Sequence, residues 1–351
     1  MKVEGWEVRV YTVMNVLAAT LVAAAPAAAE SGAGLPKHVT PATQQAIDKG
    51  LKYLVRSQGR DGAWRSSGRY GRYPVAMSSL AGLALLMDGN TTTQGRYAPH
   101  VDRTARYLVN SSTSSGLIRR GTEDSRPMYG HGFSMLFLGQ LLGMSEDAGR
   151  EREVKQVLSR AVDLTARAQS RLGGWIYSPN SGGDEGSVTI TQMQALRSCR
   201  NAGVTVPKKV IDDAMSYLTM SMNSDGGIAY RAGNKGPSRA PITAAAVCCW
   251  FNAGEYDNPL AKRALQYAKE NIPTNRMIGH WFYAHLYLAQ AIYLAGEQEW
   301  DAYFPKIRDR LLSMQEDDGA WTDRGVGRVY GTAIALIILQ LPYNQMPIMQ
   351  R

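Results

Sequence analysis

Residues 169–175 read Gln169-Ser-Arg-Leu-Gly-Gly-Trp175, and the same pattern recurs as Gln58-Gly-Arg-Asp-Gly-Ala-Trp64 and Gln315-Glu-Asp-Asp-Gly-Ala-Trp321. Weaker copies lie at 223–228 and 114–117. Glycine supplies the positive φ that a tight turn needs, so each copy predicts a sharp connection between two helices. The glutamine can bind free backbone groups at a helix end, and the tryptophan can pack over the end of the hairpin. These residues are therefore expected to be structural.

The turns divide the chain into six units of about 50 residues, each predicted to hold two helices. The first helix of a unit is amphipathic, as at 46–55 and 211–220. The second is richer in small and apolar residues, at 76–87, 133–142, 188–199, 243–251, 282–294 and 332–341. A helix that is apolar on most faces is buried. The second helices are therefore expected to form an inner layer and the first helices an outer one.

The last apolar helix, 332–341, indicates how the units end. Short links make neighbouring helices antiparallel, so each unit is a helical hairpin. An open array of such hairpins would finish on a helix with a polar outer face. Since 332–341 is among the most apolar helices, we expect it to contact the first unit. The predicted fold is all-α, with about six hairpins closed into a ring.

The Gln/Trp turns resemble those of squalene–hopene cyclases and protein prenyltransferase β subunits, the terpenoid cyclase/protein prenyltransferase family with its prenyltransferase and squalene-oxidase repeats. Stretches 187–196, 257–260 and 330–335 look like a bacterial subgroup of that family. The resemblance implies an α/α toroid at 43–342, followed by a C-terminal tail at 343–351. It also implies an isoprenoid or lipid-like ligand in a central cavity. It does not settle the activity, because function depends on the site and not on the fold.

The first 29 residues have the order of a secretory signal. Lys2 and Arg9 are followed by an apolar run from Val10 to Ala25 and by small residues up to Ala29. We therefore expect a signal peptide at 1–29, a linker at 30–42, and a periplasmic or secreted protein. The alternative is an uncleaved membrane anchor, although the run is short for a span of roughly 20 residues. No stable membrane insertion is expected after cleavage of the signal.

Composition narrows the choice of partners. The net charge of +9 is spread along the chain, and no basic stripe is interleaved with base-stacking aromatics, so no nucleic acid is expected. Cys199, Cys248 and Cys249 lie in predicted helices and are expected to be buried free thiols. No dinucleotide fingerprint, phosphate loop or zinc-ligand spacing occurs, so we expect neither a metal nor a cofactor. The oligomeric state stays open.

Three residues are candidates for catalysis. Parallel inner helices would gather their first turns at one mouth of the ring, and Asp184 and Glu185 precede the third of these helices. Squalene–hopene cyclases protonate an alkene with Asp-x-Asp-Asp-Thr at such a position, and this pair is the nearest, incomplete counterpart. Either carboxyl could be a general acid if burial raised its pKa, or the pair could cap the helix. His131 is the candidate partner, and Gly130 and Gly132 are expected to leave its ring accessible. Its alternative is a packed, hydrogen-bonded histidine.

Aromatic and histidine side chains at the same mouth are candidates for ligand binding: Tyr129, Trp281, Tyr283, His285 and Tyr330. The chain has 18 tyrosines and only five phenylalanines, which suits a more polar ligand than a polyene. Two hypotheses follow. The toroid binds an isoprenoid, another lipid-like molecule or a glycan without chemistry, or it is an active terpenoid cyclase or polysaccharide-processing enzyme that uses Asp184 or Glu185 as the acid. The incomplete acid motif favours binding, and whether the chain is an enzyme stays open.

Overall fold

The computed structural model describes residues 34–142 and 148–350. The predicted signal peptide and the first residues of the linker lie outside these ranges. One compact unit begins at Pro36. The described part of the chain contains twelve α-helices and two short 3-10 helices and no β-strand, as predicted for an all-α fold. Within the same residues, no helix is long and apolar enough to cross a membrane.

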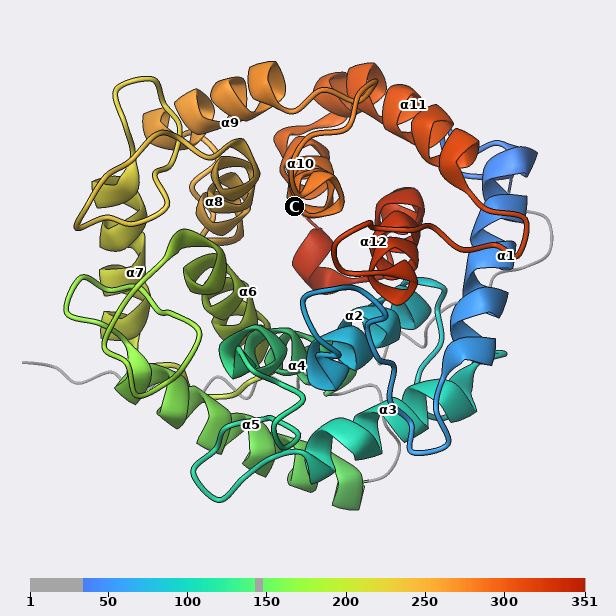
Figure 1. The fold of residues 1–351 in the computed structure, drawn as a ribbon, viewed down its shortest axis with the longest axis horizontal. Helices are drawn as coiled ribbons and strands as arrows, with labels where there is room; N and C mark the ends of the chain where they lie inside the picture. The colour runs from blue at the N-terminus through green and yellow to red at the C-terminus, as the bar shows by residue number, and fades with distance from the viewer. Residues whose placement is uncertain (1–33, 143–147, 351) are drawn as a thin grey trace, which may run out of the picture. The chain divides into compact units, whose positions relative to one another are not determined.

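The helices of this unit form two concentric layers (Figure 1). The outer helices are α1 (Pro41–Ser57), α3 (Ala98–Asn110), α5 (Ala148–Ala168), α7 (Lys208–Ser221), α9 (Pro259–Asn271) and α11 (Glu297–Met314). The inner helices are α2 (Pro74–Met87), α4 (Pro127–Leu141), α6 (Gly186–Asn201), α8 (Ala240–Asn252), α10 (Trp281–Ala295) and α12 (Arg328–Gln340). The two 3-10 helices, Leu341–Tyr343 and Pro347–Met349, follow α12.

Burial follows the apolar pattern that separated the two kinds of helix. Every residue of α2 is buried, whereas α1 buries only one stripe, from Thr43 to Leu54. A helix covered on all sides must be apolar all round, and a helix that faces water on one side must be amphipathic. The predicted inner and outer layers are confirmed.

The last hairpin packs on the first and closes the ring. Helix α12 contacts both α1 and α2, and α11 contacts α1. Hydrogen bonds cross the same seam, among them one from the Gly68 amide to the Val326 carbonyl at 3.0 Å and one from the Gln315 amide group to the Ala46 carbonyl at 2.8 Å. The predicted contact between 332–341 and the first unit is therefore present.

The Gln/Trp turns make the same contacts in three hairpins. The indole N–H of Trp175 donates to the Thr165 carbonyl at 2.7 Å, ten residues earlier in the chain, and Trp64 and Trp321 bond to Leu54 and Leu311 in the same way. The amide of Gln169 donates within its own turn and also to the next outer helix, at the Val210 carbonyl 2.9 Å away. These residues fasten each turn to its neighbours, which is the predicted structural role.

Helix α4 begins at Pro127, six residues before its predicted start at Phe133. Proline suits the first helical position because it lacks an N–H that would have no partner there. Gly130 and Gly132 lie inside the helix, where a Cβ would come within 3.0 Å of Val75 and 2.6 Å of Thr191. These glycines therefore let α4 approach α2 and α6 closely.

The three cysteines are buried and free, as expected. Burial raises the pKa of the Cys199 thiol to about 12, so this thiol stays protonated. All three side chains behave as small apolar residues of the inner layer.

Candidate functional site

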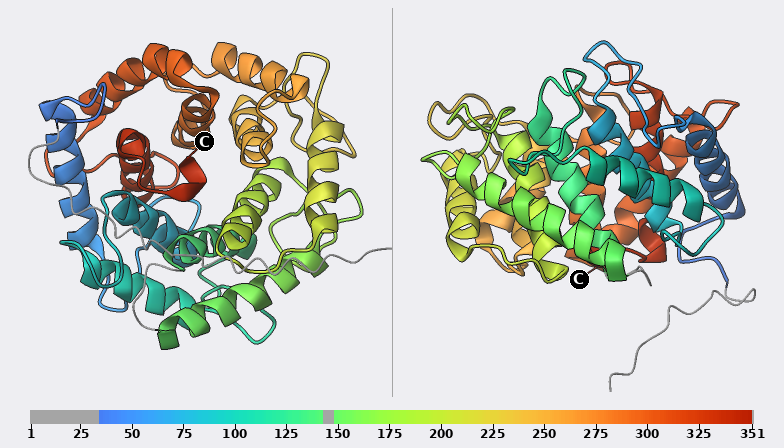
Figure 2. Two further views of the ribbon diagram at one scale, coloured as in Figure 1. Left: turned by 180° about the vertical axis from the view of Figure 1, so that it is seen from behind. Right: turned by 90° about the horizontal axis from the view of Figure 1, so that it is seen from below.

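A cavity of about 530 Å³ opens where the inner helices begin. All six inner helices or the loops just before them contribute to its lining, which includes Tyr73, Tyr129, Ser187, Ile242, Tyr283 and Tyr330. The long loops that precede these helices gather at one face of the ring (Figure 2). The inner helices are therefore parallel and share one mouth, as the sequence predicted.

Tyrosine dominates the lining, and the side chains furthest along their helices are apolar. Seven tyrosines and one phenylalanine line the cavity: Tyr70, Tyr73, Tyr129, Tyr177, Tyr230, Tyr283, Tyr330 and Phe133. Met77, Leu80 and Phe133 belong to the first two turns of α2 and α4, and Leu80 lies about 9 Å along its helix from Pro74. The lining side chains furthest along their helices, Leu80 and Phe133, are therefore apolar, whereas the lining near the helix starts mixes Tyr, Ser and Arg with Pro241, Ile242 and Val326. None of the described residues lining it is Asp or Glu.

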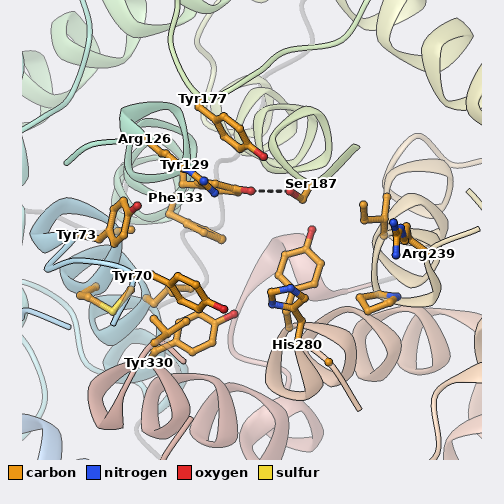
Figure 3. Close-up of a pocket in the computed structure, with 18 of the residues that line it drawn as sticks. Tyr70, Tyr73, Arg126, Tyr129, Phe133, Tyr177, Ser187, Arg239, His280 and Tyr330 are labelled. Carbon is orange, nitrogen blue, oxygen red and sulfur yellow. Dashed lines mark hydrogen bonds between the residues drawn. The ribbon is translucent and has the colours of Figure 1, made fainter. Parts of the chain in front are cut away.

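One wall carries a row of hydroxyl groups (Figure 3). The Tyr129 hydroxyl lies 2.6 Å from Ser187 Oγ and 3.3 Å from Glu185 Oε1. The hydroxyls of Tyr177 and Tyr230 are hydrogen-bonded to each other. Burial raises the pKa of both Tyr129 and Tyr230, so these phenols keep their protons and can donate at neutral pH.

Glu185 is buried beneath this wall and caps α6. Its carboxyl accepts the backbone N–H of Ser187 at 2.9 Å through Oε2 and that of Val188 at 2.7 Å through Oε1. Burial raises its pKa, while these hydrogen bonds oppose the rise. Asp184 is only partly buried, and neither carboxylate lines the cavity. Glu185 therefore has the geometry of a helix cap, which was the alternative to a general acid.

His131 lies outside the cavity, between α4 and α5. It is fully buried, so the expectation of an accessible ring was wrong. Its Nδ1 accepts the Ile118 N–H at 3.1 Å, which leaves Nε2 to carry the proton toward Thr165 Oγ1 at 3.0 Å. Burial lowers the pKa of the imidazole to about 4.

Hydroxyl residues occupy the matching position in other hairpins. The Ser78 hydroxyl accepts the backbone N–H of Trp64 at 2.9 Å, and the Thr189 hydroxyl accepts the backbone N–H of Trp175 at the same distance. Thr243 and Thr332 do the same for Ile228 and Trp321. His131 therefore replaces a hydroxyl that fastens a turn to an inner helix, which is the packed alternative for this residue.

His285 and Trp281 are also turned away from the cavity. The Nδ1 atom of His285 lies 2.8 Å from the Tyr303 hydroxyl, and Nε2 lies 3.3 Å from the Pro273 carbonyl. The Trp281 ring packs against the imidazole with 4.4 Å between centroids. Of the residues selected from the sequence, Tyr129, Tyr283 and Tyr330 line the cavity, while Asp184, Glu185, His131, Trp281 and His285 do not.

No family model and no curated protein matches this sequence. Solved structures do match it. The type II terpene cyclase MstE from Scytonema is 15% identical, with a TM-score of 0.60 over 87% of this chain and 98% of that chain. An unsaturated glucuronyl hydrolase from Bacillus sp. GL1 is 14% identical, with a TM-score of 0.60 over 85% of this chain and 96% of that chain. A GH76 α-mannanase from Bacteroides thetaiotaomicron is 9% identical, with a TM-score of 0.62 over 86% and 95%.

The chain is an α/α toroid. Its neighbours share this fold and differ in chemistry, since one is a cyclase and two act on sugars. Structures of MstE contain geranylgeranyl dihydroxybenzoate as substrate and merosterolic acid A as product. At these identities the likeness extends to the fold, and the cavity lining of this toroid must be interpreted from its own residues.

Several lining residues of the toroid were not predicted: Tyr70, Arg126, Tyr177, Ser187, Tyr230, Arg239 and His280. Most come from loops before the inner helices, where no periodicity guides a prediction. A signal was present for two of them. Tyr177 follows the turn residue Trp175 by two positions, and Tyr230 follows Ile228 by two. The same short step after the turn brings both rings to the mouth.

Replacing Glu185 by alanine is expected to lower the free energy of unfolding by about 2 kcal/mol, because the change leaves the buried Val188 N–H and the partly buried Ser187 N–H without their acceptor. Urea denaturation followed by circular dichroism measures this loss. Asp184→Ala is the neighbouring control and is expected to cost less than Glu185→Ala, because the Asp184 side chain is only partly buried and does not cap α6. Equal costs for the two variants would contradict the capping role.

Proposed function

We propose that the toroid binds an isoprenoid or another lipid-like molecule in its cavity, with the apolar body inward and the polar end at the mouth. The change from Tyr, Ser and Arg at the mouth to Met77, Leu80 and Phe133 at depth carries this proposal. A cavity of about 530 Å³ lies within the usual range for small-molecule sites. The isoprenoid substrate of MstE, a protein with the same fold, supports the choice of ligand class.

The residues that line the cavity do not favour cleavage of a glycosidic bond in a sugar polymer. Glycosidases generally place two carboxyl groups on either side of the bond they cleave. The described lining residues include no carboxylate, and both oxygens of Glu185 accept hydrogen bonds from backbone N–H groups. Tyrosine faces could stack on sugar rings, but a carbohydrate site does not need the apolar floor made by Leu80 and Phe133.

A second candidate is an active terpenoid cyclase, and one observation favours it. Burial raises the pKa of Glu185, and its carboxyl reaches the cavity wall through the Tyr129 hydroxyl at 3.3 Å. A Glu185–Tyr129 pair could then supply a proton. Cyclisation of squalene can leave its mass unchanged, so gas chromatography coupled to mass spectrometry, after incubation with the wild type and with Glu185→Gln, tests this candidate. A cyclised product formed only by the wild type would establish it.

We also propose that the protein works in the periplasm or outside the cell. The charged, apolar and small-residue order of 1–29 supports this location. N-terminal sequencing of the protein recovered from cell fractions tests it. A mature chain that begins near Glu30 is the expected result, and an intact Met1 in the cytosolic fraction would contradict it.

Blocking the cavity is expected to weaken ligand binding at least tenfold. Met77 lines the cavity, and its replacement by tryptophan would fill part of the apolar floor. Equilibrium dialysis with geranylgeraniol measures the affinity, and mass spectrometry identifies any lipid retained during purification. Met220→Trp on the exposed side of α7 is the matched control and should bind as the wild type does.

The outcomes separate the ligand classes. A wild type that binds no isoprenoid probe and retains no lipid during purification would overturn the proposal. Binding of a glucuronate disaccharide in place of the isoprenoid would assign the cavity to a glycan. Circular dichroism of both tryptophan variants verifies that the fold is intact.

A further inference from the structure

Two arginines, Arg126 and Arg239, line the mouth of the cavity. Other arginines near the mouth form ion pairs, as Arg72 does with Glu123 at 3.1 Å and Arg328 does with Asp318 at 2.6 Å. Arg126 and Arg239 are exposed and line the cavity, and no ion pair joins either of them to another residue that the structure describes. Fixed positive charges therefore face the polar end of the cavity.

The surroundings of Arg126 fix its orientation. Its guanidinium carbon lies 4.3 Å from the centroid of the Tyr177 ring, a stacked arrangement that holds the planar group in place. Arg239 stands on the other side of the mouth, and Tyr129 and Ser187 lie between the two arginines (Figure 3). The mouth thus presents two cationic groups on either side of a row of hydroxyls.

The buried carboxylate of Glu185, behind the row of hydroxyls, forms no ion pair with either arginine. Glu185 faces the backbone N–H groups of Ser187 and Val188, and it does not line the cavity. His280, which is exposed at the N-terminus of α10, adds another basic side chain to the lining. With a ligand whose polar end is neutral, the guanidinium groups of Arg126 and Arg239 would have only water as a partner. A ligand with an anionic end would form ion pairs with them.

We infer that the polar end of the ligand is an anion, a phosphate or a carboxylate, held at the mouth between Arg126 and Arg239. The inference rests on the proposed lipid-like ligand and specifies its class. Guanidinium groups bind both anions through charge-assisted, often bidentate hydrogen bonds. The hydroxyls of Tyr177 and Tyr230 bond to each other, so one of the two keeps a free proton to donate a further hydrogen bond to the same group.

The test compares three probes that share one isoprenoid chain: geranylgeraniol, geranylgeranyl phosphate and geranylgeranoic acid. At about 50 mM salt we expect both anions to bind at least tenfold more tightly than the alcohol, and a smaller advantage at about 500 mM salt. Arg126→Met and Arg239→Met should each weaken binding of the anions about tenfold and leave binding of the alcohol unchanged. Arg160→Met, an equal change of charge at an exposed position of the outer helix α5, is the control.

Each result has one interpretation. Equal affinity for the alcohol and the anions would overturn the anionic end and leave the lipid-binding proposal intact. Failure of all three probes would overturn the lipid-binding proposal itself. Inorganic phosphate that binds as tightly as geranylgeranyl phosphate would also overturn the inference, because the arginines would then serve a free ion. A preference between phosphate and carboxylate identifies the chemistry of the ligand end.

Discussion

Replacement of Trp175 by alanine is expected to lower the free energy of unfolding by about 4 kcal/mol. The indole is fully buried, and its N–H donates to the Thr165 carbonyl at 2.7 Å. Removing the ring leaves a void at the end of the hairpin and a backbone carbonyl without its donor. Urea denaturation of the wild type and the variant, followed by far-ultraviolet circular dichroism, measures the difference.

Two further variants separate packing from hydrogen bonding. Trp175→Phe keeps most of the volume and loses the indole N–H, so its cost should be about 1–2 kcal/mol. Leu172→Ala lies in the same turn at an exposed position and should cost less than about 0.5 kcal/mol. A cost near zero for Trp175→Ala would mean that the Gln/Trp turn does not hold the hairpin.

Acidification is expected to remove about 3 kcal/mol of the stability that His131 contributes, because burial lowers the pKa of its imidazole to about 4 in the folded state, against about 6.5 in the unfolded chain. The neutral ring stabilises the fold fully above pH 6.5, and this contribution falls as the pH drops toward 4. A protonated Nδ1 would point its hydrogen at the Ile118 N–H, which it must accept from in the fold. The stability difference between wild type and His131→Asn should therefore shrink between pH 7 and pH 4.

The stability of the wild type is compared with that of His131→Asn at each pH, because other titrating groups stabilise the fold as the pH falls. Burial raises the pKa of Asp124 to about 6, so this residue favours the folded state as the pH falls through that value. Ser78→Ala is the control, since Ser78 accepts the Trp64 N–H at the matching position and does not titrate in this range. Its cost should be the same at both pH values. A constant cost for His131→Asn as well would refute the titration.

The layers and closure of the ring could be predicted because burial alone decides them. A helix such as α2 must be apolar all round to be covered by neighbours on every side, and this pattern is visible in one sequence. The start of α4 could not be predicted in this way. Pro127-Met-Tyr-Gly-His-Gly132 has the composition of a loop, and packing against α2 and α6 makes it helical.

The candidate site was predicted in part, and helix phase explains the errors. Tyr129 and Tyr283 line the cavity, while His131 and His285 each follow two positions later. Side chains two positions apart on a helix point about 200° away from each other, so a tyrosine and a histidine at that spacing cannot both face the cavity. This argument was available from the sequence. The positions of Arg126 and Arg239 were not, because the course of the loops that hold the mouth depends on tertiary contacts.

The bond between Gln315 and Ala46 joins the last hairpin to the first, so the ring has no terminal hairpin. The ring therefore cannot close until the ribosome has synthesised the last hairpin. Until α12 emerges, the apolar faces of α2 and α10 that it covers remain open to water and to other chains. Intermediates that form before the ring closes are therefore open arcs with exposed apolar surface, and such surface favours aggregation.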